Sequence, residues 1–230
     1  FRFIDTADVQ PDPETQALVD KLKNDLDSSL NVEIGSTTGA IDSRRNVVRG
    51  EESAMGNLIA DALLNATSAD ITIINGGGIR ADRTYDAGTM LTRRDILTEL
   101  PFGNVTVLTT LSGKQVVAAL ENGFSQVEKG AGRFPQVSGL SVVYDPASEP
   151  GSRVKSVSLN GKELDLNADY KVATNDYMLG GGDGYSALTK GTVLINAGNG
   201  DLMANDVIEY IIAKGGVSAK VEGRIKTVNQ

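Results

Sequence analysis

The chain has 230 residues, of which 40% are hydrophobic and 23% charged, as is typical of a globular protein. Its formal net charge of −8 opposes binding to nucleic acid or to an anionic membrane, and no apolar run is long enough for membrane insertion. Because the sequence contains no histidine and no cysteine, it excludes disulfides, thiol nucleophiles, Ser-His-Asp triads and metal sites built on these ligands. Carboxylate chemistry and ligand binding remain.

The N-terminal residues predict a connecting helix. The chain begins at Phe1 without a signal-peptide pattern, so we expect a fragment in which residues 1–11 are the end of a preceding domain. Asp12 is a good N-cap, and Pro13 occupies the first helical position. Apolar residues at helical spacing then predict an amphipathic helix over residues 12–30: Leu18, Val19, Leu22, Leu26 and Leu30.

Residues 31–230 contain no linker and predict a single mixed α/β (α+β) domain. Helices are expected from Ser53, over residues 92–100, from Ser112 and over residues 207–214. At Ser112, Gln115 provides the second half of a capping box. The pair Asn160-Gly161 predicts a β-hairpin. The expected strands cover residues 31–36, 70–75, 105–110, 140–144, 154–159, 163–166, 170–174 and 221–227.

Two triple-glycine loops follow predicted strands, INGGGIR at 74–80 and MLGGGDGY at 178–185. Glycine lets a ligand approach the backbone, and α/β proteins bind ligands at the carboxyl ends of strands. Neither loop matches the dinucleotide-binding or P-loop pattern. A tight turn is the alternative for each loop. The presence of two, each with a charged residue, favours a binding site.

Arginines and aromatic residues in loops add to this signal. Guanidinium groups suit bidentate recognition of phosphate or carboxylate, although each arginine could also be a solvated surface charge. Arg80 lies on the first glycine loop and fits that alternative least. Phe102 lies in a turn, and Tyr177 precedes the second glycine loop. A planar base could stack on such rings, or the rings could close the ends of the core.

Several stretches, in order and at matching spacing, resemble the C-terminal domain of the 5′-nucleotidase family. They are MGNLIADAL (55–63), ADITIINGGGIR (69–80), LPFGN (100–104), GRFPQVSGL (132–140), VYD (143–145) and GGDGY (181–185). The resemblance covers roughly residues 11–228. The family includes UDP-sugar hydrolases, ecto-5′-nucleotidases and 2′,3′-cyclic phosphodiesterases.

The resemblance implies a two-domain parent protein. Its N-terminal metallophosphoesterase domain is expected to hold two divalent metal ions and a catalytic His–Asp pair, and its C-terminal domain to bind the nucleoside. This chain has no histidine, so we expect no catalytic residue, no metal ligand and no cofactor within it. Its expected partners are a nucleoside or nucleotide and the N-terminal domain of the same polypeptide.

The resemblance also implies roles for individual residues. Phe102 and Tyr177 resemble the base-stacking pair, although many relatives have phenylalanine at the second position. Asp183 resembles the carboxylate that holds the ribose hydroxyls, and Asn75 a contact to the base or sugar edge. Arg80 and Arg49 resemble the phosphate-binding arginines, and Arg45 is expected to join them. Gly181 and Gly182 are expected to let the sugar approach the backbone closely.

Together these features predict the substrate-recognition domain of a periplasmic, secreted or cell-surface phosphohydrolase, and a fragment without hydrolytic activity. Two alternatives remain open. The parent could act on cyclic nucleotides, nucleotide sugars, dinucleotides or sulfur compounds. The domain could instead be a non-catalytic interaction module at the cell surface.

Overall fold

The computed structural model describes residue 7 and residues 9–229. The helices are α1 (Pro13–Leu30), α2 (Arg45–Val48), α3 (Ala54–Thr67), α4 (Arg93–Glu99), α5 (Gly113–Phe124), α6 (Asp176–Leu179) and α7 (Met203–Lys214). The strands are β1 (Glu33–Ser36), β2 (Ile41–Asp42), β3 (Ile71–Asn75), β4 (Thr84–Tyr85), β5 (Met90–Thr92), β6 (Thr106–Ser112), β7 (Pro135–Ser138), β8 (Leu140–Tyr144), β9 (Val154–Leu159), β10 (Lys162–Glu163), β11 (Asp169–Asn175), β12 (Thr192–Ile195) and β13 (Ile225–Thr227). Helices and mixed sheets confirm the predicted fold class.

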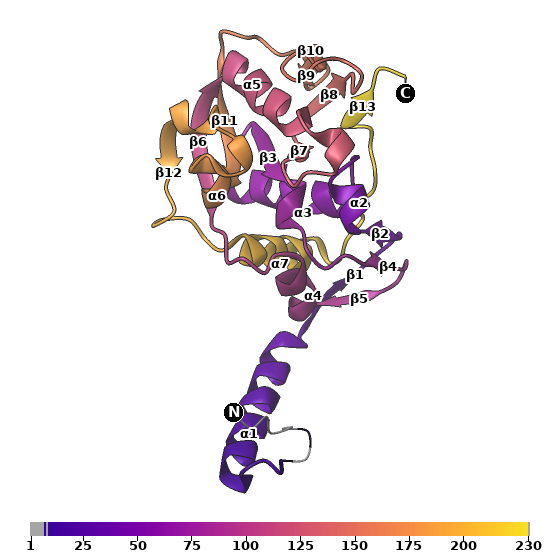
Figure 1. The fold of residues 1–230 in the computed structure, drawn as a ribbon, viewed down its shortest axis with the longest axis vertical. Coiled ribbons are helices and arrows are strands. Elements are labelled where there is room, and N and C mark those ends of the chain that lie inside the picture. The colour runs from indigo at the N-terminus through magenta and orange to yellow at the C-terminus, as the bar shows by residue number, and fades with distance from the viewer. Residues whose placement is uncertain (1–6, 8, 230) are drawn as a thin grey trace, which may run out of the picture.

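A five-stranded sheet in the order β12-β6-β11-β3-β7 forms the centre of the domain (Figure 1). Strands β3 and β11 run parallel, and the other neighbours are antiparallel. Every residue of β3 is buried, because the sheet is covered on both faces. Ile74 packs in the core cluster that includes α3 and α7, while Ile73 packs in the cluster that includes α5. Burial on both faces accounts for the uninterrupted apolar run in β3.

A four-stranded sheet, β10-β9-β8-β13, completes the second core cluster. Within it Phe124 stacks on Tyr144, with ring centroids 4.1 Å apart. The predicted hairpin is confirmed, since β9 and β10 pair around Asn160-Gly161 and both turn residues have positive φ. Two small sheets, β1-β5 and β2-β4, lie beside α4 and α7 (Figure 1).

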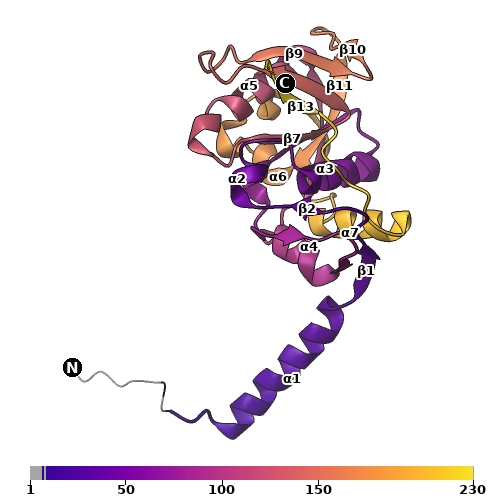
Figure 2. The same cartoon turned by 90° about the vertical axis from the view of Figure 1, so that its right-hand side faces the viewer.

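Helix α1 extends away from the rest of the domain (Figure 2). The Asp12 carboxylate accepts a hydrogen bond from the Thr15 amide, which confirms the predicted N-cap. No residue of α1 is buried, however, and its apolar side chains are about half exposed: Leu18, Val19, Leu22 and Leu26. These four side chains therefore do not pack into the core, and of the predicted apolar residues only Leu30, at the end of the helix, is partly buried.

The prediction for residues 1–11 falls mainly on residues 1–6 and 8, which lie outside the described residues. Within the described part of the chain, no helix combines the length and apolar composition that a membrane span requires.

Candidate functional site

Both glycine loops begin at the same edge of the central sheet. Strands β3 and β11 are parallel neighbours, so their last residues, Asn75 and Asn175, lie side by side. The Asn175 amide donates a hydrogen bond of 3.1 Å to Oδ1 of Asn75. This pairing brings together two loops that are about one hundred residues apart in the sequence.

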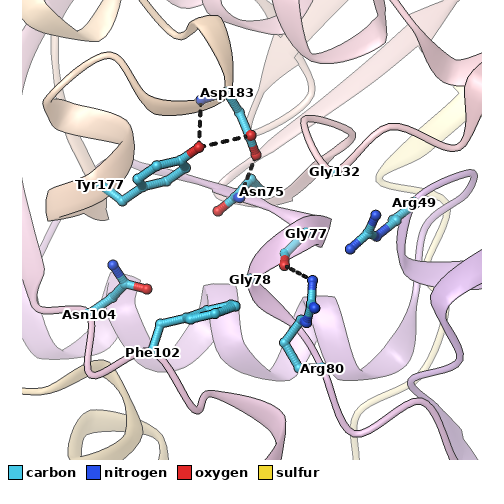
Figure 3. Close-up of a pocket in the computed structure, with 10 residues that line it drawn as sticks. All are labelled: Arg49, Asn75, Gly77, Gly78, Arg80, Phe102, Asn104, Gly132, Tyr177 and Asp183. Carbon is cyan, nitrogen blue, oxygen red and sulfur yellow. Dashed lines mark hydrogen bonds between the residues drawn. The ribbon is translucent and has the colours of Figure 1, made fainter.

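A hydrogen-bonded network links Asn75, Asp183 and Tyr177 (Figure 3). Nδ2 of Asn75 donates to Oδ2 of Asp183 over 2.7 Å, and the Tyr177 hydroxyl donates to Oδ1 over 3.0 Å. The Asp183 amide in turn donates to the Tyr177 hydroxyl oxygen over 3.1 Å. Asp183 has a φ of 53°, which is unusual for a residue other than glycine, and these contacts offset the cost of holding this left-handed backbone conformation. Burial and the hydrogen bond to Asp183 raise the pKa of Tyr177.

Gly181 and Gly182 occupy a different place from the one expected. Neither is among the residues that line the cavity beside Asp183. A Cβ at Gly182 would lie 2.5 Å from the Tyr177 ring, so this glycine leaves room for the aromatic side chain. Gly181 provides the left-handed turn, with a φ of 89°. Both glycines therefore shape the support of Tyr177.

A cavity of about 460 Å³ opens between Tyr177 and Phe102, within the range of small-molecule sites. The two rings lie on opposite sides of it (Figure 3). Phe102 is 60% exposed and Tyr177 is 49% exposed. By contrast, Phe124, Phe134, Tyr85 and Tyr185 are fully buried in the core. This exposure argues against the alternative that the two rings close the ends of the core.

Arg49 enters the cavity from the end of α2. Gly76 makes this approach possible, since a Cβ there would lie 1.8 Å from the carbonyl oxygen of Val48. The buried Gln136 amide donates to the carbonyl oxygens of Val48 and Glu51 and holds this segment in place. Arg49 is 8% exposed, and its Nε has no hydrogen-bond partner among the described residues. Burial, with repulsion from neighbouring arginines, lowers the pKa of Arg49.

Arg80 lies on the same side of the cavity as Arg49 (Figure 3). Its guanidinium lies 5.3 Å from the Phe102 ring centroid, and its Nη1 is 3.5 Å from the Gly77 carbonyl oxygen. Arg45 does not line this cavity. It borders a smaller adjoining hollow of about 120 Å³, together with Arg49, Arg80 and Asp82, whose carboxylate accepts a hydrogen bond from the Arg45 amide. Neither Arg49 nor Arg80 forms an ion pair with a described residue, and the nearby carboxylates of Asp82 and Asp183 offset only part of the positive charge of the three arginines at this end of the site.

The structure brings six of the nine predicted site residues to one cavity: Arg49, Asn75, Arg80, Phe102, Tyr177 and Asp183. Gly77 and Gly78 of the first glycine loop also line it, as do Asn104 and Gly132, which were not singled out from the sequence. Each lies within a stretch that resembles the family, so the motifs contained the signal. Nδ2 of Asn104 donates to Asp176 over 2.9 Å, and the Asn104 carbonyl oxygen points toward the space between the two rings (Figure 3).

The donor set of the described residues does not fit a metal centre. No group of three or more Asp, Glu, His or Cys side chains is placed to hold a metal ion in the part of the chain that the structure describes. The arrangement offers aromatic stacking, one carboxylate and two or three arginines. This is chemistry for binding an anionic ligand with a planar group.

Comparisons with known proteins agree on one family. The family model described as "5′-nucleotidase, C-terminal domain" matches residues 33–190. The trifunctional nucleotide phosphoesterase protein YfkN of Bacillus subtilis is 40% identical over 95% of this chain and 15% of its own length. Snake venom 5′-nucleotidase of Naja atra is 33% identical over 94% of this chain and 44% of its own. The crystal structure of a 5′-nucleotidase precursor from Thermus thermophilus superposes with a TM-score of 0.83 at 35% identity, over 94% of this chain and 43% of that one. The chain thus spans less than half the length of each of these three proteins.

Proposed function

Because the chain belongs to the family of 5′-nucleotidase C-terminal domains, we propose that its cavity binds a nucleotide and presents it to a catalytic domain elsewhere in the parent protein. One observation carries this proposal. Two exposed aromatic side chains, Phe102 and Tyr177, lie on opposite sides of a cavity that ends at Arg49 and Arg80, neither of which is ion-paired with a described residue. The base lies between the rings in this proposal. Stacking on aromatic side chains contributes about 1–3 kcal/mol per base.

Asp183 binds the ribose hydroxyls in the same proposal. Each of its carboxylate oxygens accepts one hydrogen bond from the protein, which leaves a second lone pair on each for a ligand hydroxyl. The second N–H of the Asn75 amide is also available, since its other polar groups bond to Asp183 and Asn175. The sugar then lies between the stacked base and the arginines.

Asn104 contacts the edge of the base. Its amide nitrogen is held by Asp176, so its carbonyl oxygen is the group that faces the ligand. A carbonyl oxygen accepts hydrogen bonds only, and it therefore favours a base with an exocyclic amino group at this edge over one with a carbonyl. Adenine and cytosine carry such a group, and uracil does not.

Arg49 and Arg80 bind the phosphate, and Arg45 adds positive charge from the adjoining hollow. The orphaned Nε of Arg49 supports this role, because a buried donor without a partner costs stability until a ligand satisfies it. Because the chain as a whole has a net charge of −8, three neighbouring arginines are an unusual concentration of positive charge for it.

We place this chain in a larger phosphohydrolase. Residues 1–11 end a preceding catalytic domain, residues 12–30 form the connecting helix, and residues 31–230 bind the substrate. The metal ions of the parent lie in the other domain, and the chain alone has no hydrolytic activity. The venom origin of one relative supports a secreted, periplasmic or cell-surface location.

Isothermal titration calorimetry with AMP tests the binding site. Wild-type protein binds AMP, and Phe102→Ala weakens binding about tenfold or more through loss of stacking. Ile212→Ala is the matched control, since Ile212 is 56% exposed on α7 and does not line the cavity. Equal AMP affinity in wild type and Phe102→Ala would exclude the stacking site. Binding of a protein partner that survives Phe102→Ala, in a chain that binds no nucleotide, would favour an interaction module.

Substrate class is tested by comparing AMP with UMP, UDP-glucose and 2′,3′-cyclic AMP. The geometry at Asn104 predicts that AMP binds more tightly than UMP. Tighter binding of the cyclic nucleotide or the nucleotide sugar would assign the parent to one of the alternative substrate classes. Phosphate release from AMP by the purified chain, sensitive to EDTA, would contradict the separation of binding from catalysis.

A further inference from the structure

Glu99 is a completely buried carboxylate beside the proposed phosphate end of the site. It is the last residue of α4 and precedes the turn that carries Phe102. A buried carboxylate is costly unless hydrogen bonds satisfy it, so its contacts show what it stabilises. Burial also raises the pKa of Glu99.

Most contacts of Glu99 come from the segment from Arg80 to Tyr85, and the Ser43 hydroxyl is a further neighbour of its carboxyl group. Its backbone carbonyl oxygen accepts from the Arg80 amide over 2.9 Å. Its Oε2 accepts from the Ala81 amide over 3.3 Å, and its Oε1 accepts from the Tyr85 hydroxyl over 2.8 Å. Three bonds from one residue therefore fix both ends of the loop that carries Arg80.

The Arg80 side chain itself has little support from the protein. Among the described residues, its side chain donates one hydrogen bond, a long one of 3.5 Å to the Gly77 carbonyl oxygen, and it forms no ion pair. The position of its guanidinium over the Phe102 ring therefore depends on the backbone on which it is mounted. Glu99 joins that backbone to the turn of Phe102.

We propose that Glu99 is a positioning residue, which holds the Arg80 loop so that the guanidinium faces the phosphate of a bound nucleotide. This inference rests on the proposed function of the cavity. It assigns a role in nucleotide affinity to a side chain that does not line the cavity. A purely structural role would lower stability without changing which ligand binds.

The experiment compares AMP with adenosine by calorimetry, since only AMP contacts Arg80 through a phosphate. Glu99→Leu removes both side-chain acceptors and is expected to weaken AMP binding about tenfold, while adenosine binding changes less than about twofold. Glu99→Gln restores binding, because its carbonyl accepts from the Ala81 amide and its amide donates to the Tyr85 hydroxyl. Adding Glu99→Leu to Arg80→Ala causes no further loss.

Two more variants complete the test. Asp206→Asn alters another buried carboxyl, which bonds to Thr106 and not to the Arg80 loop, and it keeps the wild-type ratio of AMP to adenosine affinity. If Glu99→Leu does not fold in a thermal melt, Tyr85→Phe removes one of the two side-chain bonds and weakens AMP binding about threefold.

A wild-type affinity ratio in folded Glu99→Leu, or in Tyr85→Phe where Glu99→Leu is unfolded, overturns the positioning role. Additive losses in the double variant overturn it as well. If the wild-type protein binds neither ligand, the proposed function fails instead, so the two failures are distinguishable.

Discussion

At the scale of single residues, the hydroxyl of Tyr177 joins two parts of the site. It donates to Oδ1 of Asp183 and accepts from the Asp183 amide. A phenylalanine at this position would keep the stacking surface but leave both groups without that partner. The hydroxyl therefore couples the base platform to the carboxylate that we assign to the sugar.

Tyr177→Phe is expected to weaken adenosine binding about fivefold, since a hydrogen bond contributes about 1 kcal/mol. Binding of 2′,3′-dideoxyadenosine should stay unchanged, because that ligand has no ribose hydroxyls for Asp183 to hold. Calorimetry with the two nucleosides checks this. Equal losses for both ligands would mean that the hydroxyl supports the ring alone.

Asp206 provides a pH-dependent term in stability. Burial raises its pKa above the ordinary value of 3.8, although a hydrogen bond from the Thr106 hydroxyl opposes the shift. The folded state therefore holds this proton more tightly than the unfolded state. Through Asp206, the free energy of unfolding falls as pH rises from 3.8 through the raised pKa and is constant above it.

Asp206→Asn removes this dependence, because asparagine has no proton to lose at this position. Relative to wild type, the variant should gain stability as pH rises from about 4 to 7, and the difference should then level off. Thermal melts of both proteins across this range measure it. A difference that is independent of pH would show that Asp206 titrates normally in the folded state.

At the scale of elements, local signals were predictable from the sequence and pairing across long distances was not. The capping box at Ser112 is confirmed, because it needs only Gln115 three residues later. Strand β7 was missed. Its partner β3 lies about sixty residues earlier, and the short segment has little pattern of its own. Strands β2, β4, β5 and β12 were missed for the same reason.

Ser112→Ala tests the contribution of this cap. Loss of an N-cap side chain lowers the free energy of unfolding by about 1 kcal/mol. Nucleotide affinity should not change, since Ser112 does not line the cavity. Urea unfolding followed by circular dichroism gives the first quantity and AMP titration the second. An unchanged unfolding midpoint would show that the capping box does not stabilise α5.

At the scale of the whole molecule, the sequence identified most residues of the site but not their assembly. Phe102, Tyr177 and Asp183 stood out because aromatic and charged residues in loops lack a core role. Asn104 did not, because its orientation depends on Asp176, which lies 72 positions later. The parallel pairing of β3 with β11, which brings the two glycine loops together, also depends on the complete fold.

The local sequence pattern also did not predict where α1 lies relative to the rest of the domain. Its contact with the domain includes the ion pair between Arg94 and Asp27 and the bond from Arg94 to Asn31. Exposed ion pairs contribute about 0–1 kcal/mol. A chain that begins at residue 31 should therefore melt within about 4 °C of the complete chain. A much lower melting temperature would show that α1 is part of the cooperative unit.

The cavity between Phe102 and Tyr177 is expected to bind a nucleotide. Titration of the isotope-labelled chain with AMP and adenosine, followed by NMR chemical shifts, measures this binding residue by residue. We predict shifts concentrated at both glycine loops and the two aromatic residues, with tighter binding of AMP than of adenosine. No shifts at millimolar ligand, or shifts confined to another surface, would contradict the claim.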